Sequence, residues 1–467
     1  MINFKKLKQF LTKNERNKVY LRKNKRSARL VADNKLKTKA ILGKAGINVP
    51  KLIIRFRNVI ELEKFKWEAL EGNFVIKPAS GYGGEGIVIV RRRGKYAGEW
   101  IKMDGTLIST QDLVSHCQEI LAGKYSLHNI PDFVIVEERI KIHPMFLSIT
   151  KAGTPDIRVI IYNKVPVMAM FRIPTEKSGG KANLQQGAIG LGIDLATGIT
   201  TFGIEGKGNI IRKIYDYGKK KLRKVNGIKI PMWKEVMETS VKCQEAMPGL
   251  GFLGVDVVLD KEKGPAVLEV NARPGLSIQV CNRAGLKNRM DKLEEIEVRS
   301  MSHAITLSKY LFGEKFFEKV EEKEKVRTVG PLETIKIKTG KGKKNFKEVK
   351  AKIDTGAFRS SIDRGLAEEL GMLAPERILY LRHYRSALGK NIDRPVIGLT
   401  FWLKDRKIMT AVNVADRKKL RTKFLLGRKD LEGFLITAKS NPSVLNLPVA
   451  KRHPSLTKEG LKTKIKK

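Results

Sequence analysis

The run Phe74–Val90, FVIKPASGYGGEGIVIV, decides the fold of this chain. Two apolar stretches flank a loop with four glycines, and a lysine and a proline end the first stretch. The letters Gly-x-Gly-x-x-Gly also occur in dinucleotide-binding turns, but there the glycines open a helix. Because Ile87–Val90 is strand-like, we instead predict strand, glycine loop, strand. Such a loop is a flap whose backbone N–H groups can cover phosphates.

A second stretch, Gly254–Gly275, offers oxygen ligands for a hard cation. Glu269 and Asn271 are two residues apart on a predicted strand, so their side chains share a face. Asp256 lies on the neighbouring strand of the same predicted hairpin. Carboxylate and amide oxygens suit Mg²⁺ held together with phosphates, and Lys77 in the first stretch is placed to reach a phosphate. The alternatives are a surface lysine before a proline and ordinary polar residues at strand ends.

Composition narrows the class of protein. A chain of 467 residues should hold two or three domains. Its formal net charge of +45 either attracts polyanions, which are nucleic acid, acidic protein tails and anionic membrane surfaces, or reflects lysine used wherever a solvated residue is needed. Three cysteines without a Cys-x-x-Cys pair argue against a disulfide framework. A charged N-terminus and the lack of an apolar run of about 18 residues predict no signal peptide, no membrane span and a cytoplasmic location.

Changes in composition along the chain predict its organisation. Residues 1–30 carry eleven Lys/Arg and one acid, and we expect a basic helical arm or a solvated terminus. We expect one large domain over 31–312, a charged linker over 313–332 and a small, mostly β domain over 333–445. The tail 446–467 is again basic.

Lys-Pro with a glycine flap, followed by Asp and then Glu-x-Asn, is the pattern of the ATP-grasp family. The chain more closely resembles the RimK-type α-L-glutamate ligase-like proteins of that family, over roughly residues 15–310. The runs that carry this resemblance are Val31–Lys39, Asp156–Arg158, Asn183–Gly187 and Leu268–Gly275.

The resemblance implies an ATP-dependent carboxylate–amine ligase, in which ATP phosphorylates a carboxylate and an amine attacks the acyl phosphate. The product would be an amide, with glutamate or another amino acid added to a small peptide or a protein C-terminus. It also implies nucleotide-binding residues, which would be Lys39, Lys77, Ser80, Gly81, Gly83, Gly84, Gly86, Glu137, Glu138 and Asp156.

The same resemblance implies the remaining roles. Asp256, Glu269 and Asn271 would hold two Mg²⁺ ions, for which Mn²⁺ is an alternative. Arg158 would stabilise the charge of phosphoryl transfer, and Asn183 would face the metal and the phosphates. Candidates for gripping a substrate carboxylate are Arg172 and Arg273.

A second motif, Asp354-Thr355-Gly356, follows an apolar strand, as in the active-site turn of aspartic proteases. Phe424–Arg428 supplies the apolar segment that packs behind such a turn. Residues 333–445 therefore resemble the retropepsin-like (RimB-type) domain that accompanies RimK-type ligases, sometimes named an ATP-dependent zinc protease. The six histidines form no His-Glu-x-x-His motif, so zinc has no support. Two carboxylates must share a proton to activate water, so an active domain predicts a homodimer, and the alternative is an inactive domain kept for binding.

The predicted fold class is α+β, an ATP-grasp fold followed by a small, mostly β, retropepsin-like (acid protease) domain. Two other functions stay open. One is a non-catalytic ATP-binding module that docks on an acidic protein, the ribosome or RNA. The other is a ligase for a small peptide or an envelope metabolite.

Overall fold

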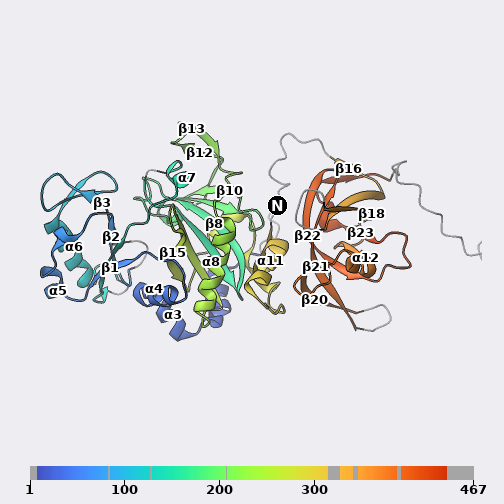
Figure 1. Cartoon of the computed structure of the whole chain (residues 1–467), viewed down its shortest axis with the longest axis horizontal. Helices are drawn as coiled ribbons and strands as arrows, with labels where there is room; N and C mark the ends of the chain where they lie inside the picture. Colours follow the sequence, from blue (N-terminus) through green and yellow to red (C-terminus); the bar gives the residue numbers. More distant parts are fainter. Residues whose placement is uncertain are drawn as a thin grey trace, which may run out of the picture. The chain divides into compact units, whose positions relative to one another are not determined.

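The computed structural model divides the chain into two units, Met1–Lys319 and Val320–Lys467 (Figure 1). The structure describes residues 8–81, 85–126, 129–150, 152–206, 208–313, 327–339, 345–385 and 391–438. The predicted linker therefore lies largely outside the described residues, and the predicted basic tail lies entirely outside them.

The first unit contains a six-stranded sheet that carries the glycine loop. In spatial order its strands are β1 (Leu52–Phe56), β6 (Val134–Glu138), β2 (Phe74–Pro78), β3 (Val88–Arg93), β4 (Glu99–Lys102) and β5 (Leu107–Ser109). Helix α6 (Thr110–Leu121) begins at a capping box made by Ser109 and Asp112. One face of the sheet packs on α6 and α5 (Val59–Glu63) around a buried aromatic core that includes Phe74 and Trp100.

The unit also contains a seven-stranded antiparallel sheet. In spatial order its strands are β11 (Asn209–Ile211), β10 (Thr200–Glu205), β9 (Ile189–Ile193), β8 (Val165–Ile173), β7 (Asp156–Tyr162), β14 (Phe252–Asp260) and β15 (Gly264–Asn271). Every residue of β8 and β14 is buried, which is expected of strands covered on both faces. Helices that pack on this sheet are α8 (Trp233–Ala246), α9 (Ile278–Asn282), α10 (Leu286–Asp291) and α11 (Met301–Phe312).

Short elements complete the first unit. They are α7 (Pro144–Leu147), the 3₁₀ turns η1 (Tyr20–Lys23), η2 (Trp67–Ala69) and η4 (Leu184–Gln186), and a separate hairpin of β12 (Lys213–Asp216) and β13 (Lys221–Lys224).

The N-terminal segment is helical, as one of the two expectations had it, but its described part is not a solvated arm. It forms α2 (Lys13–Lys18), η1 and α3 (Arg26–Ala32). Tyr20 and Leu21 are buried, and the Asn24 amide donates to the carbonyls of Phe252 and Ala272. These apolar and amide side chains, spaced among the lysines, explain why a basic segment packs against β14.

The second unit is mostly β. Its main sheet has the order β17 (Leu332–Lys338), β18 (Phe346–Asp354), β23 (Phe424–Gly427), β19 (Ser361–Asp363), β22 (Arg406–Ala415), β21 (Asn391–Leu403) and β20 (Ile378–Arg385). A further pairing of β17 with β21 closes the sheet on itself. The remaining elements are β16 (Arg327–Val329), β24 (Phe434–Ile436), α12 (Arg364–Glu369) and α13 (Arg428–Leu431).

The strand, loop and strand predicted over Phe74–Val90 correspond to β2 and β3, and the hairpin predicted over Gly254–Gly275 corresponds to β14 and β15. Among the described residues, no helix is both long enough and apolar enough to cross a membrane.

Candidate active site

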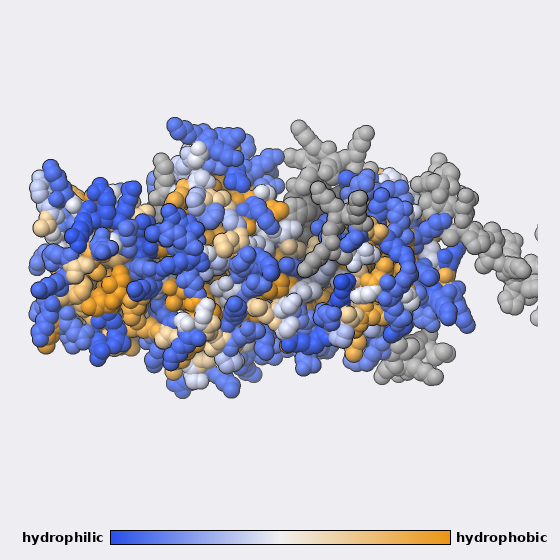
Figure 2. All heavy atoms as spheres, viewed as in Figure 1, coloured by the Kyte–Doolittle hydropathy of each residue, from blue (hydrophilic) through white to orange (hydrophobic). Residues whose placement is uncertain are grey.

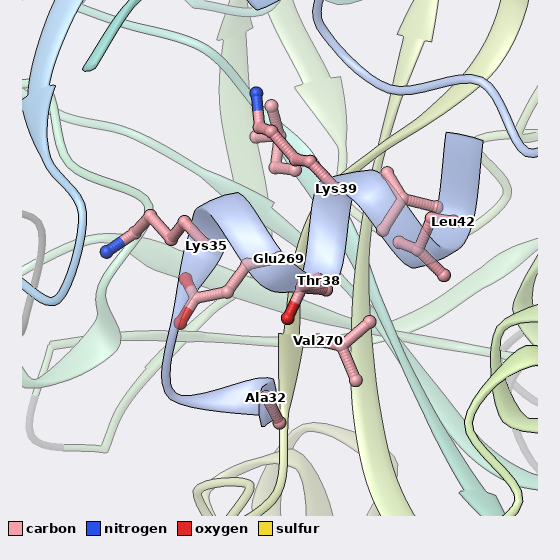
Figure 3. Close-up of a pocket in the computed structure, with 9 residues that line it drawn as sticks. Ala32, Lys35, Thr38, Lys39, Leu42, Glu269 and Val270 are labelled. Atoms are coloured by element: carbon pink, nitrogen blue, oxygen red, sulfur yellow. The ribbon is translucent and has the colours of Figure 1, made fainter. Parts of the chain in front are cut away.

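Helix α4 (Lys35–Lys44) brings two lysines to the site. It begins at Asn34, whose side-chain oxygen accepts a hydrogen bond from the Lys37 backbone N–H at 3.0 Å. Lys35 and Lys39 are four residues apart and so lie on one face of the helix. Figure 3 shows both on α4, with the Glu269 carboxylate of β15 beside Lys35. The helix therefore lies between the strands that carry the two predicted motifs.

Glu137 is the buried carboxylate of this site. The β2–β6 register pairs Val75 with Glu137, so Lys77 and Glu137 lie diagonally on one face of the sheet. Lys77 and Lys39 both form ion pairs with the Glu137 carboxylate, and Lys39 also donates to the Pro50 carbonyl at 3.2 Å. All three charged side chains are less than 10% exposed.

The glycine loop approaches the same lysines. Lys35 Nζ donates to the Gly81 carbonyl at 3.0 Å. A Cβ at Gly81 would lie 2.2 Å from Pro78, and Gly86 has a left-handed φ of +71° against the Tyr125 ring, so both positions require glycine.

The other loop residues predicted to bind the nucleotide are described only in part. The Ser80 backbone N–H donates to Asp132 at 2.7 Å, which fixes the start of the loop. Gly83 and Gly84, both predicted to contact phosphates, lie outside the described residues.

The charges of this cluster are not evenly paired. The buried Lys39 and Lys77 share the single carboxylate of Glu137, whereas the half-buried Lys35 lies near both Glu269 and Asp132. Burial, and then the nearby Lys77, lowers the pKa of Lys39 to about 8, and burial lowers the pKa of Lys35 as well. The cleft lined by α4 and β15 has a volume of only about 10 Å³, so the side chains close on one another here. A bound polyanion would supply the negative charge that Lys39 and Lys77 lack while they share Glu137.

A row of charged residues crosses the large sheet beside this cluster. Strand register places Arg158 of β7 opposite Asp256 of β14, and Asp256 opposite Glu269 of β15. Two residues along β7, Asp156 is opposite Arg172 of β8. Because side chains two residues apart on a strand share a face, all five lie on one face of four adjacent strands.

The contacts within this row centre on Asp256. Arg158 binds it with two hydrogen bonds, of 2.7 and 2.6 Å. Arg172 approaches Asp256 at 2.8 Å and donates twice to Asp156 at 2.5 Å. The Asn271 amide donates to Asp256 at 3.2 Å. The three predicted metal ligands are thus neighbours, but both oxygens of Asp256 are engaged by arginines.

The pKa values of the two buried aspartates, Asp156 and Asp256, are shifted in opposite directions. Burial opposes ionisation of Asp256, but Arg158 and Arg172 outweigh it and lower the pKa to about 2. In Asp156 burial prevails over its partner Arg172 and raises the pKa to about 6. Asp256 is therefore the carboxylate held firmly in its charged form.

The donor set fits a magnesium site. Asp256, Glu269 and Asn271 offer two carboxylates and an amide oxygen, the hard ligands that Mg²⁺ takes together with phosphate oxygens. Within the described ranges, no three His, Cys, Asp or Glu residues form a metal-binding group, so the amide would be an essential third ligand. Arg158 and Arg172 would have to turn from Asp256 as a cation binds.

Several predicted residues lie apart from these contacts. Glu138 is on the opposite face of β6 from Glu137, where it pairs with Lys263 at 2.8 Å. Asn183 caps η4 by accepting from the Gln185 N–H at 3.0 Å. Arg273 is half-exposed and binds Asp33 at 2.9 Å.

Sequence reasoning overlooked Lys35. The signal that could have found it is its spacing, one helical turn before the candidate Lys39 on a helix with a recognisable Asn cap. It also missed that Arg172 is an internal partner of Asp156 and Asp256, rather than a side chain available to a substrate.

In the second unit the Asp354 turn is well formed. The Asp354 carboxylate accepts from the backbone N–H groups of Gly356 at 2.9 Å and Ala357 at 3.1 Å. Strand β18 runs parallel to β23, with Asp354 beside Gly427. A Cβ on Gly427 would lie 2.5 Å from the Arg359 backbone, so only glycine lets the two segments approach this closely.

The comparisons with known proteins concern mainly the first unit. The model of one family, described as sugar-transfer associated ATP-grasp, matches residues 14–295. None of the curated proteins compared with the chain matches it.

Three solved structures illustrate the structural likenesses. The D-alanine–D-alanine ligase of Bacillus anthracis is 18% identical, with 57% of this chain and 67% of that chain covered and a TM-score of 0.31. The L-amino acid ligase of Bacillus licheniformis is 16% identical, with 54% and 43% covered and a TM-score of 0.30. A protein of unknown function from Legionella pneumophila is 18% identical, with 24% and 93% covered and a TM-score of 0.16.

The chain therefore spans about two thirds of the first ligase and less than half of the second. All three TM-scores are below 0.5, so these structural likenesses carry no conclusion about the function of this chain. The family match is different in kind, because it extends over more than half of the chain and includes the glycine loop, the lysine cluster and the carboxylate row. The chain belongs to the sugar-transfer associated ATP-grasp family.

Proposed function

We propose that the first unit is an ATP-dependent carboxylate–amine ligase. The γ-phosphoryl group of ATP is transferred to a substrate carboxylate, giving ADP and an acyl phosphate. The amine of a second substrate attacks the acyl carbon, phosphate leaves, and an amide bond forms. The observation that carries this proposal is the pair of buried lysines, Lys39 and Lys77, that share one carboxylate close to a row of carboxylates.

The lysine cluster supplies the phosphate-binding half of the site. Lys35, Lys39 and Lys77 are held in place before any ligand binds, by Gly81 and Glu137. Preorganised ammonium groups in a desolvated cleft stabilise developing phosphate charge more strongly than they would in water. The glycine loop, which starts at Gly81 beside Lys35, would cover the phosphates and exclude water from the acyl phosphate.

The carboxylate row supplies the metal-binding half. Asp256, Glu269 and Asn271 would hold two Mg²⁺ ions, which neutralise the transferring phosphoryl group, and Mn²⁺ would substitute for them. When Asp256 binds a cation, Arg158 becomes available for the phosphoryl group or the substrate carboxylate, while Arg172 stays bound to Asp156. The adenine would lie toward the end of β6, near Glu137 and Glu138.

The narrower resemblance to RimK-type ligases gives the substrate class proposed here. The amine would come from glutamate or another amino acid, and the carboxylate from a small peptide or a protein C-terminus. An envelope metabolite is the other candidate acceptor. The reaction would take place in the cytoplasm.

Product analysis tests this proposal. The protein would be incubated with Mg²⁺-ATP and a panel of amino acids and small peptides, with ADP quantified and products weighed by mass spectrometry. The proposal expects ADP together with a product heavier than the carboxylate substrate by one amino acid less water, and it expects both to be lost in Lys77→Met. The exposed Lys64→Met is the matched control. ATP binding without turnover on any substrate would instead favour a non-catalytic module that docks on an acidic protein, the ribosome or RNA.

For the second unit we propose a retropepsin-like aspartic peptidase. The Asp354 turn supports this, because two backbone N–H groups orient the carboxylate while Gly427 packs beside it. One chain offers one such aspartate, so activity requires a homodimer in which two copies share a proton. A peptidase that trims what the ligase adds would explain the fusion. Peptide cleavage that survives Asp354→Asn would refute this second proposal.

A further inference from the structure

A basic hairpin with an apolar outer face is the most distinctive surface feature outside the site. In the β12–β13 register, Tyr215 is opposite Leu222 and Lys213 is opposite Lys224. The intervening Ile214 is 6% exposed and points inward, whereas Tyr215 is 43% and Leu222 63% exposed. The outward face therefore presents a tyrosine and a leucine between lysines.

The hairpin carries a high local charge. Residues 212–224 contain seven Lys/Arg and one acid, Asp216. That acid is buried and already engaged, because it accepts from the Lys219 backbone N–H at 3.0 Å and lies 3.8 Å from Arg223. Lys213 and Lys224 form no ion pair with any described residue. Both are therefore available to an external anion.

Backbone contacts hold the hairpin to the body of the unit. The Tyr217 N–H donates to the Ser148 carbonyl just after α7 at 2.6 Å, and the Thr200 hydroxyl of β10 donates to the Val225 carbonyl at 2.6 Å. Figure 1 shows β12 and β13 standing out from the large sheet beside α7 and β10. Figure 2 shows this projection as mainly hydrophilic. Two more exposed aliphatic residues adjoin the hairpin in sequence or by contact, Ile210 at 61% and Leu147 at 51%.

We propose that this hairpin docks the protein on an anionic lipid surface. Exposed leucine and isoleucine gain free energy when they enter the acyl boundary, and tyrosine favours the headgroup level. Lysines beside them would contact anionic headgroups. The net charge of +45 would draw the whole chain toward the same surface.

The observations favour lipid over nucleic acid as the occupant. Phosphates alone would explain the lysines but give Leu222 and Ile210 no partner. The rings of Tyr215 and Tyr217 pack edge to face, with centroids 5.0 Å apart and planes at 73°. They do not form parallel platforms on which bases could stack. Exposed apolar side chains flanked by lysines are the pattern of an interfacial anchor.

Vesicle co-sedimentation tests the proposal. The full chain would be mixed with vesicles of equal parts phosphatidylglycerol and phosphatidylcholine, and with vesicles of phosphatidylcholine alone. We expect strong binding only to the anionic vesicles. The partition coefficient should fall about tenfold in Leu222→Ser. It should fall about fivefold for each of Lys213 and Lys224 replaced by glutamine.

Leu107→Ser is the matched control, because Leu107 is 62% exposed on β5, outside the hairpin. Its partition coefficient should equal that of the wild type, and nucleotide binding should be unchanged in every hairpin variant. Equal effects of Leu107→Ser and Leu222→Ser would overturn the proposal, as would equal binding to both vesicle types. The same variants would also be tested for binding to RNA. If the lysine variants weaken RNA binding while Leu222→Ser changes neither vesicle binding nor RNA binding, the hairpin is an RNA contact and the proposal is wrong.

Discussion

Glu137 is the residue whose replacement tests the lysine cluster most sharply. Its carboxylate is 3% exposed and is the ion-pair partner of both Lys39 and Lys77. Glu137→Gln leaves two buried ammonium groups uncompensated. Removing one partner of a buried ion pair costs about 3 to 5 kcal/mol. For a unit of this size that corresponds to a fall in Tm of roughly 4 to 7 °C.

Glu262→Gln is the matched control. Glu262 is 52% exposed and its partner Lys141 is 58% exposed, so this surface pair contributes at most about 1 kcal/mol. Thermal unfolding followed by circular dichroism, with and without Mg²⁺-ATP, compares the two variants. ATP should restore more of the lost stability in Glu137→Gln than it adds to the wild type, since its phosphates replace the missing negative charge. Equal destabilisation by the two variants, or an unchanged Tm in Glu137→Gln, would refute this reasoning.

Three further outcomes are expected. Glu269→Gln should lower the rate of ADP formation about a hundredfold or more, because it removes a metal ligand. Its Tm should change little, because no ion pair of Glu269 is found among the described residues. Normal turnover would show that Glu269 is not a metal ligand. The pKa of Lys39 is about 8, below the usual range for lysine, and bound phosphates favour its charged form. Above pH 8, nucleotide binding should therefore be coupled to protonation of Lys39 and should weaken as the pH rises. Calorimetry in buffers of different ionisation enthalpy measures that uptake, which should vanish in Lys39→Met. Asp354→Asn should abolish peptide cleavage without changing the Tm of the second unit, since an amide oxygen can still accept from Gly356 and Ala357.

The sequence allowed the fold of the first unit to be predicted where local pattern and chemistry agreed. The glycine run between two apolar stretches could only be a loop between strands, and the spacing of Glu269 and Asn271 placed them on one face. These inferences need only the two-residue period of a strand. Lys39, Lys77 and Glu137 were singled out as well, but as separate nucleotide contacts and not as the ion pairs that they form with one another.

What the sequence could not provide was the pairing of distant strands. That Arg158 is opposite Asp256, and Arg172 opposite Asp156, depends on the register of β7 with β14 and β8. Register is set by packing across the whole sheet, and a shift of one residue would turn every side chain to the other face. The docking of the N-terminal helices was missed for a similar reason, because their partners lie more than 200 residues away.

Nucleotide titration by calorimetry tests the central claim most directly. Mg²⁺-ATP would be titrated into the wild type, Lys77→Met and the exposed-lysine control Lys64→Met. If the buried lysines bind the phosphates, the wild type and Lys64→Met bind with equal affinity, and Lys77→Met binds at least about tenfold more weakly, the equivalent of about 1.4 kcal/mol. Equal affinity in all three proteins would contradict the account, because it would place the nucleotide elsewhere in the chain.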